Sequence, residues 1–144
     1  MKIRNVVIDT NALISFVTDR DHNQQAKVAW LLENAAKLHF TIFCPLNVIT
    51  EFVYVLLNIY RVPKTTVKQM VSDFIVMPGV EIVTDLDFEI FFSIWPDHVS
   101  DYGDAIVAAV CKTKKGAYVA TFDRKFRKDL EKLGVRVYNF SQPS

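Results

Sequence analysis

Short apolar runs alternate along the chain with segments in which apolar residues recur at helical spacing. The short runs predict strands over residues 3–8, 40–44, 80–83, 117–121 and 135–138. The helical spacing predicts helices directly after Asp9 and over residues 22–38, 45–60, 64–76, 85–95, 101–115 and 124–133. Strands that alternate with helices favour a parallel sheet with right-handed crossovers. We therefore expect a three-layer α/β/α fold with a central parallel sheet of four to five strands.

Length and composition predict one domain over residues 1–144. The 51% hydrophobic composition suffices for a core without disulfides or a structural metal. Cys44 and Cys111 lie far apart and have no partner at zinc-binding spacing, so we expect two buried free thiols. We find no signal peptide, and the longest apolar segment, residues 48–60, is shorter than the roughly 20 residues that span a bilayer. These features predict a cytoplasmic protein with no membrane contact.

The net charge of +1 hides an uneven distribution along the chain. Residues 81–104 hold seven carboxylates and no Lys or Arg, whereas residues 111–136 hold nine basic residues and three acidic ones. An acidic region followed by a basic one suits a metal site beside a phosphate-binding surface. The alternative is that these charges only solvate exposed helix faces.

Four acidic residues fall at the carboxyl-terminal edge of the predicted sheet, where open parallel sheets bind ligands. They are Asp9, Glu51, Asp104 and Asp123. Helix capping is the alternative role for Asp9 and Asp123, which precede helices, and for Asp101, which stands three residues before Asp104. Capping does not explain Glu51. It interrupts a helix that is apolar on nearly every face and that we expect to be largely buried, where a charge is costly unless it is paired or binds metal.

Converging carboxylates indicate a bound cation. Two of them about 4 Å apart repel by roughly 4 kcal/mol at an effective dielectric near 20, and a divalent ion removes that penalty. Because no His or Cys joins these oxygen ligands, we expect Mg²⁺ or Mn²⁺ in preference to zinc. Asn11 could contact water or substrate, and Thr121 could orient Asp123, although both residue types are also ordinary hydrogen-bonding residues of turns and strand ends.

The order and context of these residues resemble the PIN-domain ribonucleases, and most closely the toxins of prokaryotic VapBC toxin-antitoxin pairs. The resemblance rests on four segments: Asp9-Thr10-Asn11, the isolated Glu51, residues 104–109, and residues 121–126. It implies a PIN-like fold, Mg²⁺- or Mn²⁺-dependent endonucleolytic cleavage of RNA, and inhibition by an antitoxin. It places the family's catalytic and metal-binding acids on Asp9, Glu51, Asp104 and Asp123, and its following polar residue on Asn11. Asp101 is an additional acid whose role stays open.

Metal-assisted hydrolysis of an RNA phosphodiester is the function that we expect, with several basic residues as candidates for holding the RNA backbone. They are Arg124, Lys125, Arg127, Lys128 and the group Lys112, Lys114 and Lys115. An RNA-processing nuclease of the same type, outside a toxin-antitoxin pair, is one alternative. A phosphohydrolase with Asp9 as nucleophile is another, although Asn11 stands where such an enzyme has a second Asp. A non-catalytic metal-binding interaction module is a further possibility.

The excess of apolar residues on the long helices has two interpretations. Either some aromatic surface is exposed to a second copy or to an antitoxin, or all of it lines one core. The residues in question are Phe52, Tyr54, Leu57, Tyr60, Phe88, Phe91, Phe92 and Trp95. The first interpretation predicts a homodimer.

Overall fold

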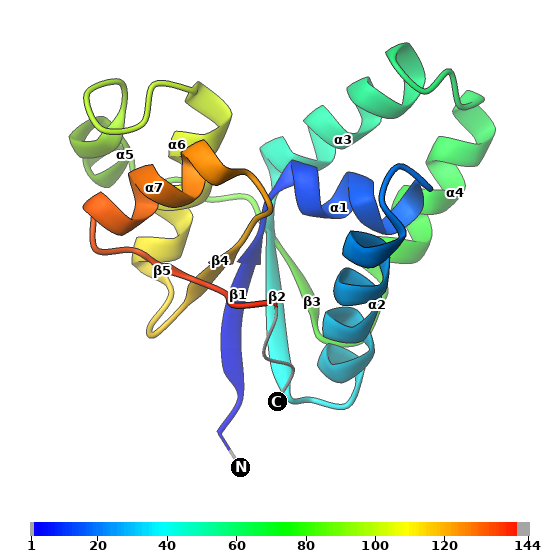
Figure 1. Cartoon of the computed structure of the whole chain (residues 1–144), viewed down its shortest axis with the longest axis horizontal. Coiled ribbons are helices and arrows are strands. Elements are labelled where there is room, and N and C mark those ends of the chain that lie inside the picture. Colours follow the sequence, from blue (N-terminus) through cyan, green and yellow to red (C-terminus); the bar gives the residue numbers. More distant parts are fainter. Residues whose placement is uncertain (1, 141–144) are drawn as a thin grey trace.

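The computed structural model describes residues 2–140 and contains a five-stranded parallel sheet (Figure 1). Its strands are β1 (Arg4–Ile8), β2 (Phe40–Pro45), β3 (Val80–Val83), β4 (Tyr118–Ala120) and β5 (Arg136–Val137). They lie in the order β3-β2-β1-β4-β5, and each pair is parallel. The expected three-layer α/β/α fold is confirmed.

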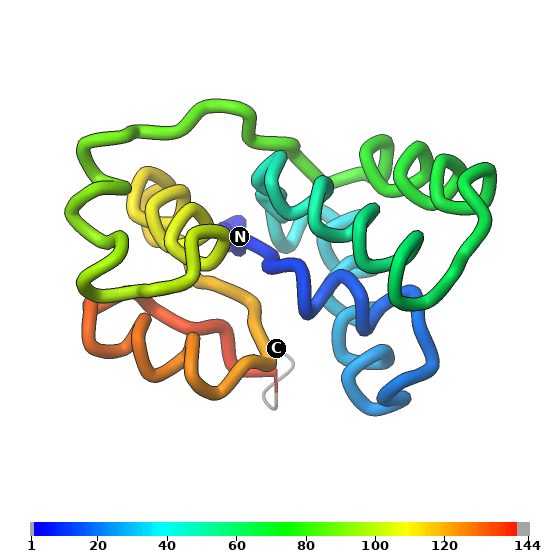
Figure 2. The backbone as a smooth tube through the Cα atoms, turned by 90° about the horizontal axis from the view of Figure 1, so that it is seen from above, coloured from blue at the N-terminus to red at the C-terminus, as the bar shows by residue number. Residues whose placement is uncertain are grey.

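Seven helices cover the two faces of the sheet in the described part of the chain. One face carries α1 (Thr10–Val17), α2 (His22–Ala36), α3 (Leu46–Asn58) and α4 (Lys64–Ile75). The other carries α5 (Phe88–Ile94), α6 (Tyr102–Thr113) and α7 (Arg124–Lys132). Figure 2 shows these two groups separated on either side of the sheet. Right-handed crossovers require this division, because the chain moves in one direction from β1 to β3 and in the other from β4 to β5.

The central strand, β1, lies in the core of the fold, and its carboxyl end lies next to the candidate site. Val6, Val7 and Ile8 are fully buried, since helices cover both faces of a parallel sheet. The strand order reverses at β1, so the crossovers beside β1 and β4 leave in opposite directions. Ligands of open α/β sheets bind at such a switch point, outside the carboxyl ends of the strands.

The expectation that the helix after β2 is largely buried is wrong. Only Val48, Phe52 and Leu56 of α3 are buried, at the spacing of a single helical stripe. Tyr54 is 63% exposed, and Ile59, directly after the helix, is 65% exposed. The helix covers the sheet with one side only. The apolar composition of α3 therefore does not show how much of the helix is buried.

The other differences are at element boundaries. Pro45 ends β2 and precedes α3, where the sequence placed it inside the helix. Helix α5 begins at Phe88, because the carboxylate of Asp87 caps it by accepting from Ile90 N–H at 3.1 Å. Both cysteines are buried and free, as expected. No helix among residues 2–140 is long and apolar enough to cross a membrane.

Candidate metal and nucleic-acid site

Five carboxylates line one cavity of about 410 Å³ at the carboxyl end of the sheet. They come from four separate parts of the chain: Asp9 after β1, Glu51 on α3, Asp101 and Asp104 at the start of α6, and Asp123 before α7. Asn11 lines the same cavity. We call this the acidic cavity.

Three candidate residues lie elsewhere. Thr121 is buried just after β4, below the acidic cavity. Arg124 and Lys125 are exposed in the first turn of α7 and do not line the acidic cavity.

Helix capping fixes three of the five carboxylates. Oδ1 of Asp9 accepts from Ala12 N–H at 2.8 Å, Oδ1 of Asp101 accepts from Asp104 N–H at 2.9 Å, and Oδ1 of Asp123 accepts from Phe126 N–H at 3.0 Å. Capping and clustering, which the sequence presents as alternatives, therefore occur together. Each cap occupies one carboxylate oxygen and leaves the second for other contacts.

Glu51 reaches the cavity from an exposed side of α3. The expectation that it is a charge on a buried helix is therefore wrong. Two neighbours hold its carboxylate. Thr10 Oγ1 donates a hydrogen bond to Oε2 at 2.8 Å. Oε1 lies so close to Gly103 that a Cβ atom at that position would be 2.8 Å away. Helix α6 approaches Glu51 this closely because residue 103 has no side chain.

Burial and the neighbouring charges raise the pKa of two of the acids, Asp9 and Asp104. Burial raises the pKa of Asp9 to about 6, with further increases from the charges of Asp123 and Glu51. Hydrogen bonds from Thr121 and Ala12 act in the opposite direction. Burial also raises the pKa of Asp104 to about 7, followed by the charges of Asp101, Asp9, Asp123 and Glu51. The cavity therefore holds protons near neutral pH unless a cation replaces them.

Thr121 joins two of the acids. Its side chain hydrogen-bonds to the carboxylate of Asp9, and its Oγ1 accepts from the backbone N–H of Asp123 at 3.0 Å. A single buried hydroxyl thus ties the end of β1 to the turn after β4 across the switch point.

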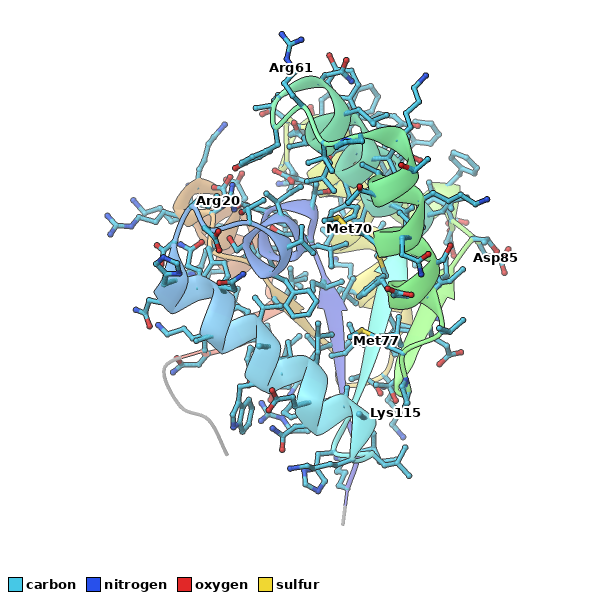
Figure 3. The ribbon with its side chains drawn as sticks, turned by 90° about the vertical axis from the view of Figure 1, so that its right-hand side faces the viewer. Arg20, Arg61, Met70, Met77, Asp85 and Lys115 are labelled. Atoms are coloured by element: carbon cyan, nitrogen blue, oxygen red, sulfur yellow. The ribbon has the colours of Figure 1, made fainter. Side chains whose placement is uncertain are left out.

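Arg20 is a cavity residue that the sequence did not indicate. It lies in the turn between α1 and α2 and is labelled in Figure 3. Its Nη2 donates to the carbonyl of Asn11 and to Ser15 Oγ, both at 2.8 Å, and its Nε donates to Ser15 Oγ at 3.1 Å. Nη2 also bonds to Oδ1 of Asn11. These bonds fix a positive charge at the edge of the cavity.

No sequence signal pointed to Arg20, because it stands outside both the acidic and the basic segments. Thr10 was visible within Asp9-Thr10-Asn11, but its contact with Glu51 spans 41 residues and depends on the tertiary structure. Val55, Ile59 and Tyr60 add an apolar edge to the cavity.

Comparisons with known proteins show the family to which this chain belongs. The PIN-domain family model matches residues 6–129, which is most of the chain and includes all five acids. The chain belongs to the PIN-domain family. Members of this family are typically nucleases. A search of the curated proteins found no match.

Two solved structures are similar to this chain. The crystal structure of PAE2754 from Pyrobaculum aerophilum is similar with a TM-score of 0.60 and 15% identity, covering 89% of this chain and 87% of that one. The structure of the PIN domain endonuclease Utp24 is similar with a TM-score of 0.49 and 16% identity, covering 94% of this chain and 86% of that one. At such identities the first similarity supports the fold alone.

The acidic cavity of this PIN domain offers the donors that a hard divalent cation prefers. Its lining provides carboxylate, amide and hydroxyl oxygens, and no His or Cys is among the lining residues. Within residues 2–140 no three acidic, His or Cys side chains are already arranged to hold an ion. Mg²⁺ usually takes one or two protein carboxylates, keeps several waters and also binds substrate phosphate. An open ring of acids fits that mode better than it fits a closed cage.

Proposed function

We propose that this PIN domain is a Mg²⁺- or Mn²⁺-dependent endoribonuclease that hydrolyses RNA phosphodiester bonds. The observation that carries the proposal is the convergence of five carboxylates from four chain segments in one cavity at the switch point of the sheet. Such a cluster destabilises an apo protein, and a bound cation removes the repulsion. Membership in a typically nucleolytic family supports the same conclusion.

Five cavity residues have a role in this proposal. Asp9 and Asp104 would hold the ion, with contributions from Glu51 and Asp123. A bound divalent ion supplies a more acidic water and stabilises negative charge on the phosphate. Glu51, held by Thr10 and open to solvent, accepts a proton from water. Arg20 offers its fixed charge to the phosphate, which the acids alone would repel.

Cleavage should require a divalent ion. We expect purified protein to cut single-stranded RNA with Mg²⁺ or Mn²⁺ and to stop with excess chelator. The products should carry 5′-phosphate and 3′-hydroxyl ends, because water attacks the phosphorus and the 3′ oxygen leaves. Gel analysis of an end-labelled RNA, with zinc and calcium as comparison ions, measures this. Equal cleavage in chelator would refute the proposed mechanism.

The contact between Gly103 and Glu51 gives a sharper prediction. Gly103→Ala pushes away the end of the Glu51 side chain, so we expect the cleavage rate to fall by roughly 10-fold, as for other residues that orient metal-site groups. The melting temperature should stay the same or rise, because Ala is favoured over Gly in helices by about 1 kcal/mol.

Thr10 provides the matched control for this contact. Thr10→Val removes the donor to Glu51 and should produce a similar loss, whereas Thr10→Ser keeps the hydroxyl and should retain most activity. Full activity of both Gly103→Ala and Thr10→Val would show that the position of Glu51 is unimportant for cleavage.

We further propose that the protein acts in the cytoplasm as the toxin of a toxin-antitoxin pair, with an antitoxin as partner. The acids and their order support this role to the extent that they resemble the VapBC toxins. A PIN-type RNA-processing nuclease is the competing role. A small upstream reading frame with a DNA-binding N-terminus favours the toxin role, and its absence favours RNA processing.

We also propose that the exposed aromatic face of α5 forms a homodimer. Phe88 is 56% exposed and Phe92 is 62% exposed, with their ring centroids 6.0 Å apart, while Phe52 and Phe91 are buried in the core. Large exposed rings that lie together are typical of interfaces. Sedimentation at micromolar concentration should give a dimer for the wild type and a monomer for the double variant Phe88→Ser/Phe92→Ser. A monomeric wild type would contradict this proposal.

A further inference from the structure

A second cavity, of about 380 Å³, lies beside the acidic one. We call it the β5 pocket. It is lined by Lys27 of α2, by Phe122 before α7, by Arg127 and Glu131 of α7, and by residues after β5 that include Tyr138 and Phe140. Figure 2 shows the end of the described chain lying between α7 and α2.

Arg127 has unused hydrogen-bonding capacity in this pocket. Its Nε atom is buried and has no hydrogen-bond partner in the described part of the chain. Its Nη2 atom donates to the carbonyl of Thr121 at a long 3.4 Å. A buried donor without an acceptor costs free energy, and because this atom is closed to solvent, only a shift of the side chain would bring it to a bound phosphate. Lys27 faces the pocket from the other side, so two bases outnumber the one acid, Glu131, among the lining residues.

The pocket also offers an aromatic surface. The rings of Phe122 and Phe140 are stacked, with centroids 4.4 Å apart and an interplanar angle of 23°. Tyr138 meets Phe140 edge-on at 4.9 Å and supports it from the core. Proteins that hold single-stranded RNA combine such stacking surfaces with basic side chains that contact the backbone.

The β5 pocket is connected to the acidic cavity. Phe122 directly precedes Asp123, so neighbouring residues line the two cavities. The carbonyl of Thr121 accepts from Arg127, and the side chain of Thr121 hydrogen-bonds to Asp9. A strand of RNA with one phosphate at the acids would therefore have an adjacent nucleotide at the β5 pocket.

We propose that the β5 pocket binds a nucleotide of single-stranded RNA next to the cleaved phosphodiester. Its base stacks on the Phe122 and Phe140 rings, and its phosphate takes hydrogen bonds from Arg127 and Lys27. This inference rests on the proposed function, because it needs RNA as the substrate. It adds Lys27 and the aromatic rings to the sequence expectation, which already placed Arg127 among the basic residues that hold the RNA backbone.

The test measures RNA binding separately from cleavage. In an Asp104→Asn background, to prevent hydrolysis, we would titrate the protein into a short single-stranded RNA carrying one 2-aminopurine, whose fluorescence falls when the base stacks. Binding would be followed by anisotropy at several salt concentrations. The variants are Lys27→Ala, Arg127→Lys, Arg127→Ala and Phe140→Leu. Lys132→Ala, an exposed base on α7 outside both cavities, is the matched control.

We expect Lys27→Ala to weaken RNA binding and to lower the salt slope by about 1, as loss of one phosphate contact does. Phe140→Leu should remove most of the fluorescence quenching and weaken binding by roughly 5-fold or more. Arg127→Ala should weaken binding more than Arg127→Lys, and Lys132→Ala should have no effect.

Two results would overturn the inference. One is unchanged affinity and quenching in Lys27→Ala and Phe140→Leu. The other is a loss of affinity only in Arg124→Ala and Lys125→Ala, which would place the RNA along the start of α7. Cleavage of RNA by the wild type, measured in parallel, separates the two proposals. If the wild type cleaves RNA and the pocket variants bind RNA normally, only the proposal for the β5 pocket is wrong. If the wild type neither cleaves nor binds RNA, both proposals are wrong.

Discussion

Asp104→Asn should lower the rate of RNA hydrolysis by roughly 1000-fold, because metal-ion catalysis contributes several kcal/mol to transition-state stabilisation and a neutral amide holds a cation poorly. Asp104 lines the acidic cavity in the first turn of α6 and feels the charges of the other four acids. The substitution keeps the shape of the side chain. It also keeps the backbone N–H of residue 104, which donates to Asp101. Steady-state cleavage of a fluorescent RNA measures the rate.

The expected loss cannot be attributed to unfolding. Asn removes a group that the other acids repel, so metal-free Asp104→Asn should melt at a higher temperature than the metal-free wild type at pH 8. Asp97→Asn, an exposed acid outside the cavity, is the matched control and should leave cleavage and melting unchanged. If Asp104→Asn cleaves RNA at the wild-type rate, the acidic cavity does not take part in the reaction.

A rise in pH should lower the stability of the metal-free protein, whereas metal binding should raise it. The folded-state pKa of Asp9 is raised to about 6 and that of Asp104 to about 7, both above the unfolded value of 3.8. The folded protein therefore binds more protons than the unfolded chain between these values, and stability falls as pH rises through this window. Asp9, which is 3% exposed, contributes a loss of roughly 1–2 kcal/mol between pH 5 and pH 8, and Asp104 adds to it in the same direction.

Mn²⁺ should reverse that trend. At pH 8 the ion takes the place of the missing protons, so the melting temperature should rise by several degrees, whereas at pH 5 protons compete with the ion and the rise should be small. Differential scanning calorimetry at pH 5, 6, 7 and 8, with chelator or with Mn²⁺, measures both effects. Asp104→Asn should flatten the dependence on pH and reduce the Mn²⁺ effect. A metal-free wild type that gains stability from pH 5 to pH 8 would contradict the pKa shifts from which this prediction is derived.

The sequence predicted the positions of the strands well, but it did not predict how much of helix α3 is buried. The strands were found within one residue at each end because they are short apolar runs. In β1, β2 and β4 most residues are buried, and burial on both faces leaves a continuous pattern. Helix α3 carries the same kind of residues, yet it buries only one stripe. Local composition records how apolar a segment is, and the neighbours of that segment determine how much of it is covered.

Glu51 shows how a residue can be selected for the wrong reason. Its isolation among apolar residues suggested a buried charge, whereas it is exposed. Its carboxylate is held in the cavity by the hydrogen bond from Thr10 and fits there because Gly103 has no side chain. Arg20 shows the opposite case, since nothing near it in the sequence differs from an ordinary turn. The β5 pocket was also hidden, because Lys27 and Phe140 are more than 100 positions apart.

The sequence by itself determined the parallel α/β architecture, the positions of the strands and the presence of acids where strands end or helices begin. These features follow from hydrophobic periodicity and capping, which act over a few residues. Only the tertiary structure decided which acids share a cavity, which hydroxyl groups hold them, where Arg20 lies at the cavity edge, and where a basic aromatic pocket lies beside them. Such contacts join residues from distant parts of the chain, and their geometry is set by how β1, β4 and the helices around them pack together.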